Sequence, residues 1–152
     1  MKKILLFLIA VFILGGCGAK REAEPVLSTG KEEENMDTAQ GEVVTRLNEV
    51  SPLLFQYHVK NDSGKEIKLD FSSSQRFDYL IINSSGEEVF LFSSVSSFLQ
   101  VLGSEVLAPG DELSYDINVK DVELNKGKYT LNVWMTPRTG KAYSTSIEFK
   151  VE

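Results

Sequence analysis

The sequence predicts an all-β domain in which two antiparallel sheets pack face to face. From about residue 42 onward, short runs alternate between apolar and polar residues with a period of two. Clusters rich in Gly, Pro, Asn and Ser separate these runs and are typical of turns. No stretch has the 3.6-residue period of an amphipathic helix, although residues 94–103 could hold a helical turn. Strands with one apolar face bury it by forming two sheets whose apolar faces pack against each other.

The alternating runs predict seven or eight short strands. Seven are explicit in the pattern and span residues 53–60, 67–71, 76–83, 88–92, 113–119, 129–135 and 143–151. The first run is expected to bury the face that carries Leu53, Phe55, Tyr57 and Val59. His58 lies on its polar face. The run 76–83 is apolar on both faces, which predicts a central strand that is covered on both sides.

The later runs follow the same rule in chain order. Residues 88–92 form a short apolar run, and the last three runs carry apolar side chains at every second position. Four turn clusters connect the runs, at residues 61–66, 83–86, 108–111 and 136–140. Four acidic residues inside the runs are predicted to face outward, and these are Asp70, Asp78, Asp116 and Glu148.

Tyr129 begins the penultimate strand, two residues after Gly127. In immunoglobulin-like sandwiches a tyrosine at this position often donates a hydrogen bond to the preceding connection. The alternative is an inward-facing aromatic residue that simply begins the strand. Both alternatives are compatible with an immunoglobulin-like antiparallel β-sandwich of seven or eight strands.

The first 16 residues have the pattern of a secretory signal. Lys2 and Lys3 are followed by eleven apolar residues, 4–14, and then by Gly15 and Gly16. Spanning a bilayer as a helix takes about 20 apolar residues, so this run is too short for a membrane span. A positive start, a short apolar run and small residues before a cleavage point indicate a signal peptide.

Cys17 is the only cysteine in the chain, and it stands directly after this run. The residues 14–17, Leu-Gly-Gly-Cys, resemble the bacterial lipobox. The resemblance implies that diacylglycerol is attached to the Cys17 sulfur and that the chain is cleaved before Cys17. Two acyl chains are enough for stable anchoring, which places the protein on the extracytoplasmic face of the cell membrane. The alternative is an ordinary secretory signal or an uncleaved anchor with an unrelated cysteine.

Residues 17–41 are predicted to form a flexible, acidic tether between the lipidated cysteine and the domain. The stretch has no aromatic residue and holds the acidic run Glu32–Glu34. It cannot bury enough apolar surface to offset the entropy of ordering it. The sequence thus predicts a signal peptide at residues 1–16, a tether at 17–41 and a β-sandwich domain at 42–152.

The composition argues against several classes of function. A net charge of −6 disfavours binding to nucleic acid, which requires a basic face. One histidine, His58, and one cysteine, Cys17, leave little for a metal site or a nucleophile. The sequence contains no Gly-x-Ser-x-Gly motif and no phosphate-binding glycine loop. We therefore expect no enzyme activity, no cofactor or metal, and no small-molecule substrate.

Several short motifs follow one another between residues 50 and 135. In order they are Gln75 with Phe77-Asp78-Tyr79, Gly86, Phe90 with Phe92-Ser93, Phe98 with Gln100, Leu107 with Pro109-Gly110-Asp111, and Gly127 with Tyr129. In this order the sequence resembles the BsuPI family, the intracellular proteinase inhibitor domain of bacilli. The resemblance implies a β-sandwich that binds proteins and inhibits a subtilisin-type serine protease. Because the signal directs export, such a target would lie at the cell surface.

The candidate partner-binding residues are Phe90, Phe92, Phe98, Leu102, Trp134 and Arg138. The first four belong to a segment that is more apolar than a solvated loop. They either form an exposed contact patch or close one end of the core. Arg138 stands in the 136–140 turn and Trp134 on the outward face of its strand. The function predicted is a protein-binding lipoprotein of the proteinase-inhibitor type. The alternative is an adaptor lipoprotein that binds a cell-wall polymer or an assembly partner.

Overall fold

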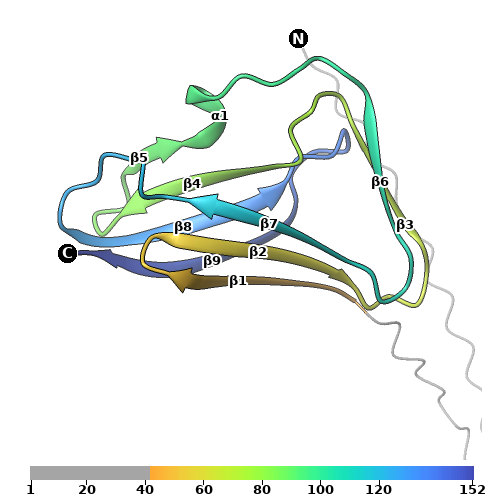
Figure 1. Cartoon of the computed structure of the whole chain (residues 1–152), viewed down its shortest axis with the longest axis horizontal. Helices are drawn as coiled ribbons and strands as arrows, with labels where there is room; N and C mark the ends of the chain where they lie inside the picture. The colour runs from red at the N-terminus through yellow and green to blue at the C-terminus, as the bar shows by residue number, and fades with distance from the viewer. Residues whose placement is uncertain (1–41) are drawn as a thin grey trace, which may run out of the picture. The chain divides into compact units, whose positions relative to one another are not determined.

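The computed structural model describes residues 42–152, and these form an antiparallel β structure with nine strands and one turn of helix (Figure 1). The elements are β1 (Val43–Ser51), β2 (Leu54–Asn61), β3 (Ile67–Phe71), β4 (Phe77–Asn83), β5 (Glu88–Leu91), α1 (Phe92–Val95), β6 (Gly103–Leu107), β7 (Glu112–Asn118), β8 (Gly127–Met135) and β9 (Ala142–Val151). The predicted all-β class is confirmed. The helical turn occurs earlier than residues 94–103, at the end of β5.

Two antiparallel sheets make up the sandwich. One has the strand order β1-β2-β7 and the other β5-β4-β8-β9. The strands β1, β2 and β7 hold the places of A, B and E in an immunoglobulin-like sandwich. The strands β4, β8 and β9 hold those of C, F and G, with β5 added at the edge. The predicted immunoglobulin-like arrangement is thus the one observed.

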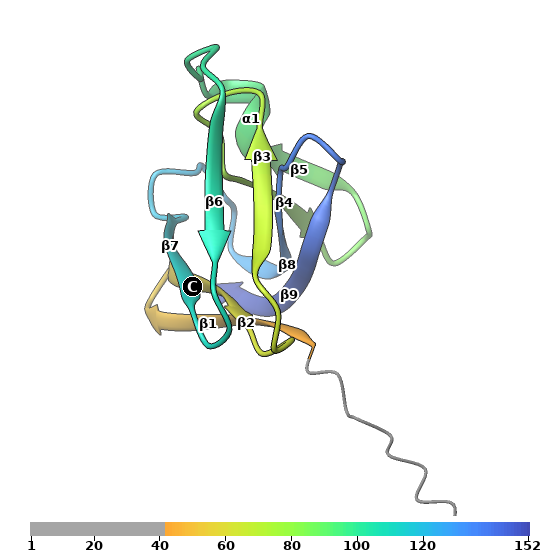
Figure 2. The same ribbon diagram turned by 90° about the vertical axis from the view of Figure 1, so that its right-hand side faces the viewer.

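The strands β3 and β6 form a separate two-stranded ribbon, which Figure 2 shows running side by side. The register pairs Ile67 with Leu107 at one end and Phe71 with Gly103 at the other. The ribbon belongs to the core because Leu69, Phe71 and Leu107 are buried in the central cluster. The run at 67–71 was predicted as a strand, but its partner β6 was not.

The core consists of the inward faces that the alternation predicts. On β2 these are Phe55, Tyr57 and Val59, all with no exposed surface. On β8 the same pattern buries every second residue, namely Tyr129, Leu131, Val133 and Met135. The two sheets therefore pack through side chains that the period of two already identifies.

Tyr129 forms a tyrosine corner, which is the first of the two alternatives that the sequence left open. Its hydroxyl donates a hydrogen bond of 2.8 Å to the backbone carbonyl of Asn125, in the connection that precedes β8. A Cβ at Gly127 would lie 3.6 Å from the Tyr129 ring, which is an ordinary van der Waals contact, so the tyrosine packs directly over this glycine. The interaction fixes how the chain enters the central strand of the larger sheet.

Asp78 departs from the expectation that it faces solvent. Only 6% of its surface is exposed, because the chain at the start of α1 comes back over it. One carboxylate oxygen accepts hydrogen bonds from the backbone N–H groups of Tyr79, at 2.9 Å, and Ser93, at 3.0 Å. A buried carboxylate held by backbone donors is a positioning element, and this one fixes α1 against β4.

Candidate functional site

The candidate site is the segment that leads from α1 to β6, which we call the aliphatic loop (residues 95–102). It has no regular secondary structure beyond the end of α1, and it crosses from the β5 edge of the larger sheet to the ribbon (Figure 1). Its middle is hydrogen-bonded at Leu99 to Ser74, in the connection between β3 and β4.

Four large aliphatic side chains of this loop lie in solvent. Their exposed fractions are 69% for Val95, 74% for Leu99, 51% for Val101 and 73% for Leu102. Within residues 42–152, only two other large apolar side chains, Val50 and Val106, are as exposed as Val101, and Val106 lies on the adjoining strand β6. Isolated apolar residues are common on surfaces, but such a concentration in one short loop makes it the candidate contact site.

The phenylalanines of this region have a different role from the aliphatic residues. The ring of Phe92 stacks on Phe77 and Tyr79, with centroid distances of 5.9 and 4.9 Å. Phe98 meets the Phe92 ring edge-on at 5.8 Å, and Phe90 stacks on Tyr79 at 5.6 Å. Phe90, Phe92 and Phe98 therefore close one end of the core, whereas Leu102 stands outside it.

Ser74 holds the middle of the aliphatic loop. Its backbone N–H donates to the carbonyl of Leu99 at 2.9 Å. In return, the N–H of Leu99 donates to the Ser74 hydroxyl oxygen at 3.0 Å. The N–H of Val101 also donates to the Leu99 carbonyl, at 2.9 Å. The backbone of the most exposed leucine is thus fixed while its side chain is free.

Arg76 holds the end of the loop where it joins β6. Its guanidinium lies 4.5 Å from the centre of the Phe71 ring and donates to Glu105 Oε1 at 2.8 Å. It also donates to the Ser73 carbonyl at 2.9 Å. A Cβ at Gly103 would lie 2.5 Å from the guanidinium, so only glycine fits there with the arginine in place. These contacts bind the loop's exit to the ribbon.

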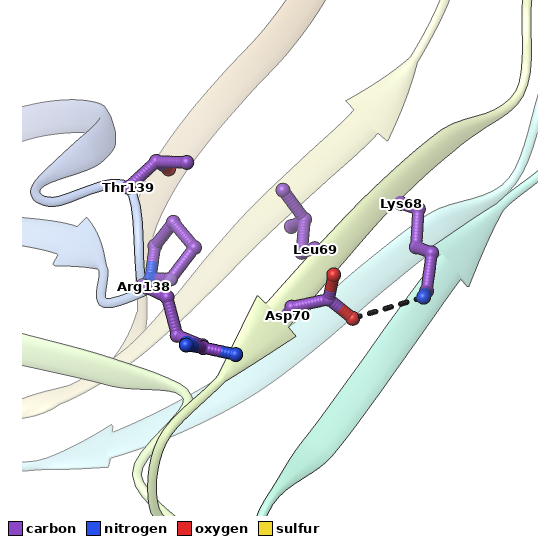
Figure 3. A pocket seen from close by; sticks show the side chains of 6 residues that line it. Lys68, Leu69, Asp70, Arg138 and Thr139 are labelled. Carbon is purple, nitrogen blue, oxygen red and sulfur yellow. Dashed lines mark ion pairs between the residues drawn. The ribbon is translucent and has the colours of Figure 1, made fainter.

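Arg138 and Trp134 are placed by other contacts. The N–H of Arg138 donates to the carbonyl of Asp70 at 2.7 Å, so the hairpin lies against β3. There it lines an open cavity of about 340 Å³, and Figure 3 shows Arg138 beside Lys68 and Asp70, which form an ion pair of 3.1 Å. Trp134 is half-buried on the outer face of β8, with the Lys141 amine 3.6 Å from its ring centre. None of these contacts involves the aliphatic loop.

His58 makes polar contacts on the surface of β2. Its Nδ1 lies 2.7 Å from Glu112 Oε1 and its Nε2 lies 3.0 Å from Gln56 Oε1. Among residues 42–152, no group of three His, Cys, Asp or Glu side chains is arranged to hold a metal ion. The same part of the chain contains no helix long and apolar enough to cross a membrane.

Three tyrosines near this end of the sandwich have pKa values above the ordinary range. Burial is the main cause for Tyr79, whose pKa rises to about 12, and the nearby Asp78 carboxylate adds to it. Burial also raises the pKa of Tyr115 to about 12, with a further contribution from Glu105. The pKa of Tyr57 is raised by burial as well. Each hydroxyl is therefore neutral in the folded protein well above the pH at which a solvated tyrosine ionises.

This shift predicts a loss of stability at alkaline pH. Unfolded tyrosine releases its proton near pH 10, while folded Tyr79 and Tyr115 keep theirs until about pH 12. Between these values the unfolded state binds fewer protons, so the stability that is fully present below pH 10 falls as the pH rises. Melting temperatures measured from pH 8 to 12 are expected to fall more steeply for the wild type than for a Tyr79→Phe, Tyr115→Phe variant. Equal slopes would contradict the assignment.

The fold and the loop together define a class of protein: a small antiparallel β-sandwich that presents an ordered, uncharged apolar loop at one end. Such an arrangement suits contact with another protein. The model of the BsuPI family, described as intracellular proteinase inhibitor, matches residues 40–140, which is well over half of the chain, and the chain belongs to this family. The resemblance seen in the sequence is thereby confirmed. A search of curated proteins finds no match.

The motifs that carry the family resemblance are mainly structural in this protein. The aromatic ones form the stack at the end of the core. In the 108–111 turn, Asp111 accepts a hydrogen bond from the Ala108 N–H at 2.9 Å, and Gly110 takes a φ of +92°. Leu99 is the unspecified middle position of the motif formed by Phe98 and Gln100, and Val101 lies outside the motifs. The signal for them was the apolar character of the segment, which sequence reasoning assigned to its phenylalanines.

Proposed function

We propose that the protein is a proteinase inhibitor of the BsuPI type that acts at the extracytoplasmic face of the bacterial membrane. Its target is a serine protease of the subtilisin class, and lipid on Cys17 holds it at the membrane. The observation that carries the activity is the family match at residues 40–140, which spans β1 to β8 and the whole of the aliphatic loop. The family is one of inhibitors rather than of enzymes, in agreement with the sequence prediction.

The arrangement of the loop supports this proposal. A protease inhibitor must present a surface that binds tightly and that resists being digested. The loop exposes aliphatic side chains for binding, while its backbone is hydrogen-bonded at Leu99 to Ser74 in the connection between β3 and β4. The location is supported by residues 1–17, which combine a signal peptide with the lipobox pattern.

The proposal is tested by titrating purified subtilisin-type proteases with the full chain in detergent. The expected result is loss of protease activity at a near-equimolar ratio, with the inhibitor recovered intact after prolonged incubation. A protease titrated with bovine albumin in the same detergent controls for simple competition by another protein. If the chain is degraded as fast as albumin and no protease is slowed, the inhibitor proposal is wrong. An adaptor would then be sought by crosslinking to envelope components.

A further inference from the structure

We propose that the aliphatic loop is the surface that contacts the protease, and that it binds through the side chains of Leu99 and Leu102 without offering its own peptide bonds for cleavage. The inference rests on the proposed function and specifies how the inhibitor binds its protease. It predicts that the ordered loop fills apolar subsites of the protease with its leucine side chains. The inhibitor would then not be a slowly cleaved substrate.

The first argument is the exposure of the side chains in the absence of charge. From Phe92 to Leu102 the chain carries no charged residue, although a quarter of the whole sequence is charged. Leu99 and Leu102 are each more than 70% exposed, so most of their apolar surface is free for a partner. An uncharged aliphatic surface matches apolar subsites in a protease cleft. An anionic lipid surface would instead attract basic residues, which the loop lacks.

The second argument is that the loop is ordered before it binds. Ser74 bonds to both backbone groups of Leu99, Phe98 packs on Phe92, and Gly103 lies against Arg76. Little conformational entropy then remains to be lost when a partner closes over the leucines. Preorganisation of this kind strengthens binding without any additional contact.

The third argument concerns cleavage. A serine protease cuts a bond only if the carbonyl of that bond reaches the oxyanion hole. The carbonyl of Leu99 already accepts hydrogen bonds from the Ser74 and Val101 N–H groups, and its own N–H is bonded to the Ser74 hydroxyl. Binding the Leu99–Gln100 bond as a substrate would therefore break three hydrogen bonds inside the inhibitor.

The bond after Leu102 is shielded in a different way. Gly103 is the first residue of β6, where it is paired with Phe71. The Arg76 guanidinium lies against this glycine and is itself held by Glu105. A catalytic serine that approached this bond would have to displace the arginine and open the ribbon. The side chain of Leu102 is accessible to a partner, but the peptide bond between Leu102 and Gly103 is protected by the pairing of β6 with β3 and by Arg76.

The contact is tested with Leu99→Asp and Leu102→Asp in the full chain, measured as inhibition constants against the protease that the wild type inhibits. Burying a leucine typically changes a binding constant by about ten- to a hundredfold, and each aspartate is expected to weaken inhibition by at least that factor. Val50→Asp on β1 is the matched control, since Val50 is 53% exposed and distant in the chain. It is expected to inhibit like the wild type. Leu99→Ser and Leu102→Ser repeat the test without a charge.

The absence of cleavage is tested with Ser74→Ala, which removes the hydroxyl that accepts from the Leu99 N–H. Ser72→Ala, at an exposed serine two residues earlier, is the control. Mass spectrometry after incubation with protease is expected to show the wild type and the control intact. The Ser74→Ala chain loses the bond to the Leu99 N–H but keeps both bonds to the Leu99 carbonyl, so it is expected to be cut at Leu99–Gln100 slowly but faster than the control. A Ser74→Ala chain that stays as intact as the control would contradict this role of the hydroxyl.

The outcomes separate the two proposals. If the wild type inhibits and both aspartate variants inhibit equally well, the protease binds elsewhere, and the inference is wrong while the proposed function stands. If the wild type inhibits but is found cut within residues 98–103 in the complex, the loop acts as a substrate, and the inference is again wrong. If the wild type slows no protease, both are overturned.

Discussion

Replacing Asn61 with leucine is expected to lower the free energy of unfolding by about 3 kcal/mol or more. Asn61 is fully buried at the end of β2, and its side chain makes four hydrogen bonds. Its Nδ2 donates to the carbonyls of Lys65 and Leu107, at 2.7 and 2.8 Å. Its Oδ1 accepts from the N–H and the hydroxyl of Ser63, at 3.0 and 2.6 Å. Leucine has a similar size but removes all four bonds, at about 1–3 kcal/mol for each partner that stays buried without another bond. The Ser63 hydroxyl keeps its bond of 3.2 Å to the Lys65 carbonyl.

The effect of this change extends beyond one turn because Asn61 joins three elements. Its backbone N–H donates to the Asp111 carbonyl, and its own carbonyl accepts from the Gly110 N–H. The same residue thus connects the end of β2, the end of β6 and the turn before β7. Without it the β3–β6 ribbon is expected to exchange its amide hydrogens faster than the two sheets do. Chemical denaturation and hydrogen exchange measure the two effects.

Asn83 provides a matched control for this prediction. Its Oδ1 also accepts from two backbone N–H groups, those of Ser85 and Glu87, at 2.9 and 3.0 Å. These bonds lie in an exposed turn, where water replaces a lost partner. Asn83→Leu is therefore expected to cost less than about 1 kcal/mol. If Asn61→Leu is no more destabilising than Asn83→Leu, burial of Asn61 does not increase the contribution of its hydrogen bonds to stability, and the prediction is wrong.

The contrast between the two asparagines shows where sequence reasoning ends. Both stand in turn clusters, and the sequence predicts both turns correctly. The periodicity also identified the buried faces of β2 and β8, because a strand that buries one face needs an apolar residue at every second position. Whether a turn residue is buried depends on which distant strands close over it. For Asn61 these are the ends of β6 and β7, which local pattern does not reveal.

The strands that sequence reasoning missed have the same explanation. In β6 only Leu107 is fully buried, and Val106 faces solvent, so the run lacks a clear alternation. In β1 only Leu47 is buried, so most of that strand gives no apolar signal. These strands are held by their hydrogen-bonded partners, β3 and β2, rather than by a strongly apolar face.

For the candidate site, the sequence predicted the region and left open whether its apolar residues are exposed or close the core. In the structure the three phenylalanines close the core and Leu102 is exposed, whereas the exposed Leu99 and Val101 were not among the candidates. The segment 89–102 is visibly rich in apolar residues. The phenylalanines have the largest apolar side chains of the segment. The hydrogen bond from the Ser93 N–H to Asp78 holds α1 against β4, and Phe92 therefore packs on the aromatic stack. The apolar side chains of the segment that remain exposed to solvent are aliphatic. In the sequence Asp78 has the pattern of an outward-facing strand residue. In the structure its carboxylate accepts two backbone hydrogen bonds and positions α1, so that Phe92 is covered and the aliphatic residues are exposed.

Replacing Cys17 with alanine is expected to remove the protein from the membrane fraction or to leave it as the unprocessed precursor. The thiol of Cys17 is the only one in the chain, so no other cysteine can take the lipid. Diacylglycerol supplies two acyl chains, and loss of both lowers the affinity for a bilayer far more than any single side chain could.

The measurement combines fractionation of cells with the intact mass of the protein. The wild-type mass is expected to lack residues 1–16 and to include the added lipid, whereas the alanine variant shows neither change. Ser28→Ala in the predicted tether is the control, and it should be processed and anchored normally. The melting temperature of the Cys17→Ala protein should equal that of the wild type, because the change lies outside the folded domain. A Cys17→Ala protein that is still cleaved and still membrane-bound would refute the lipid anchor.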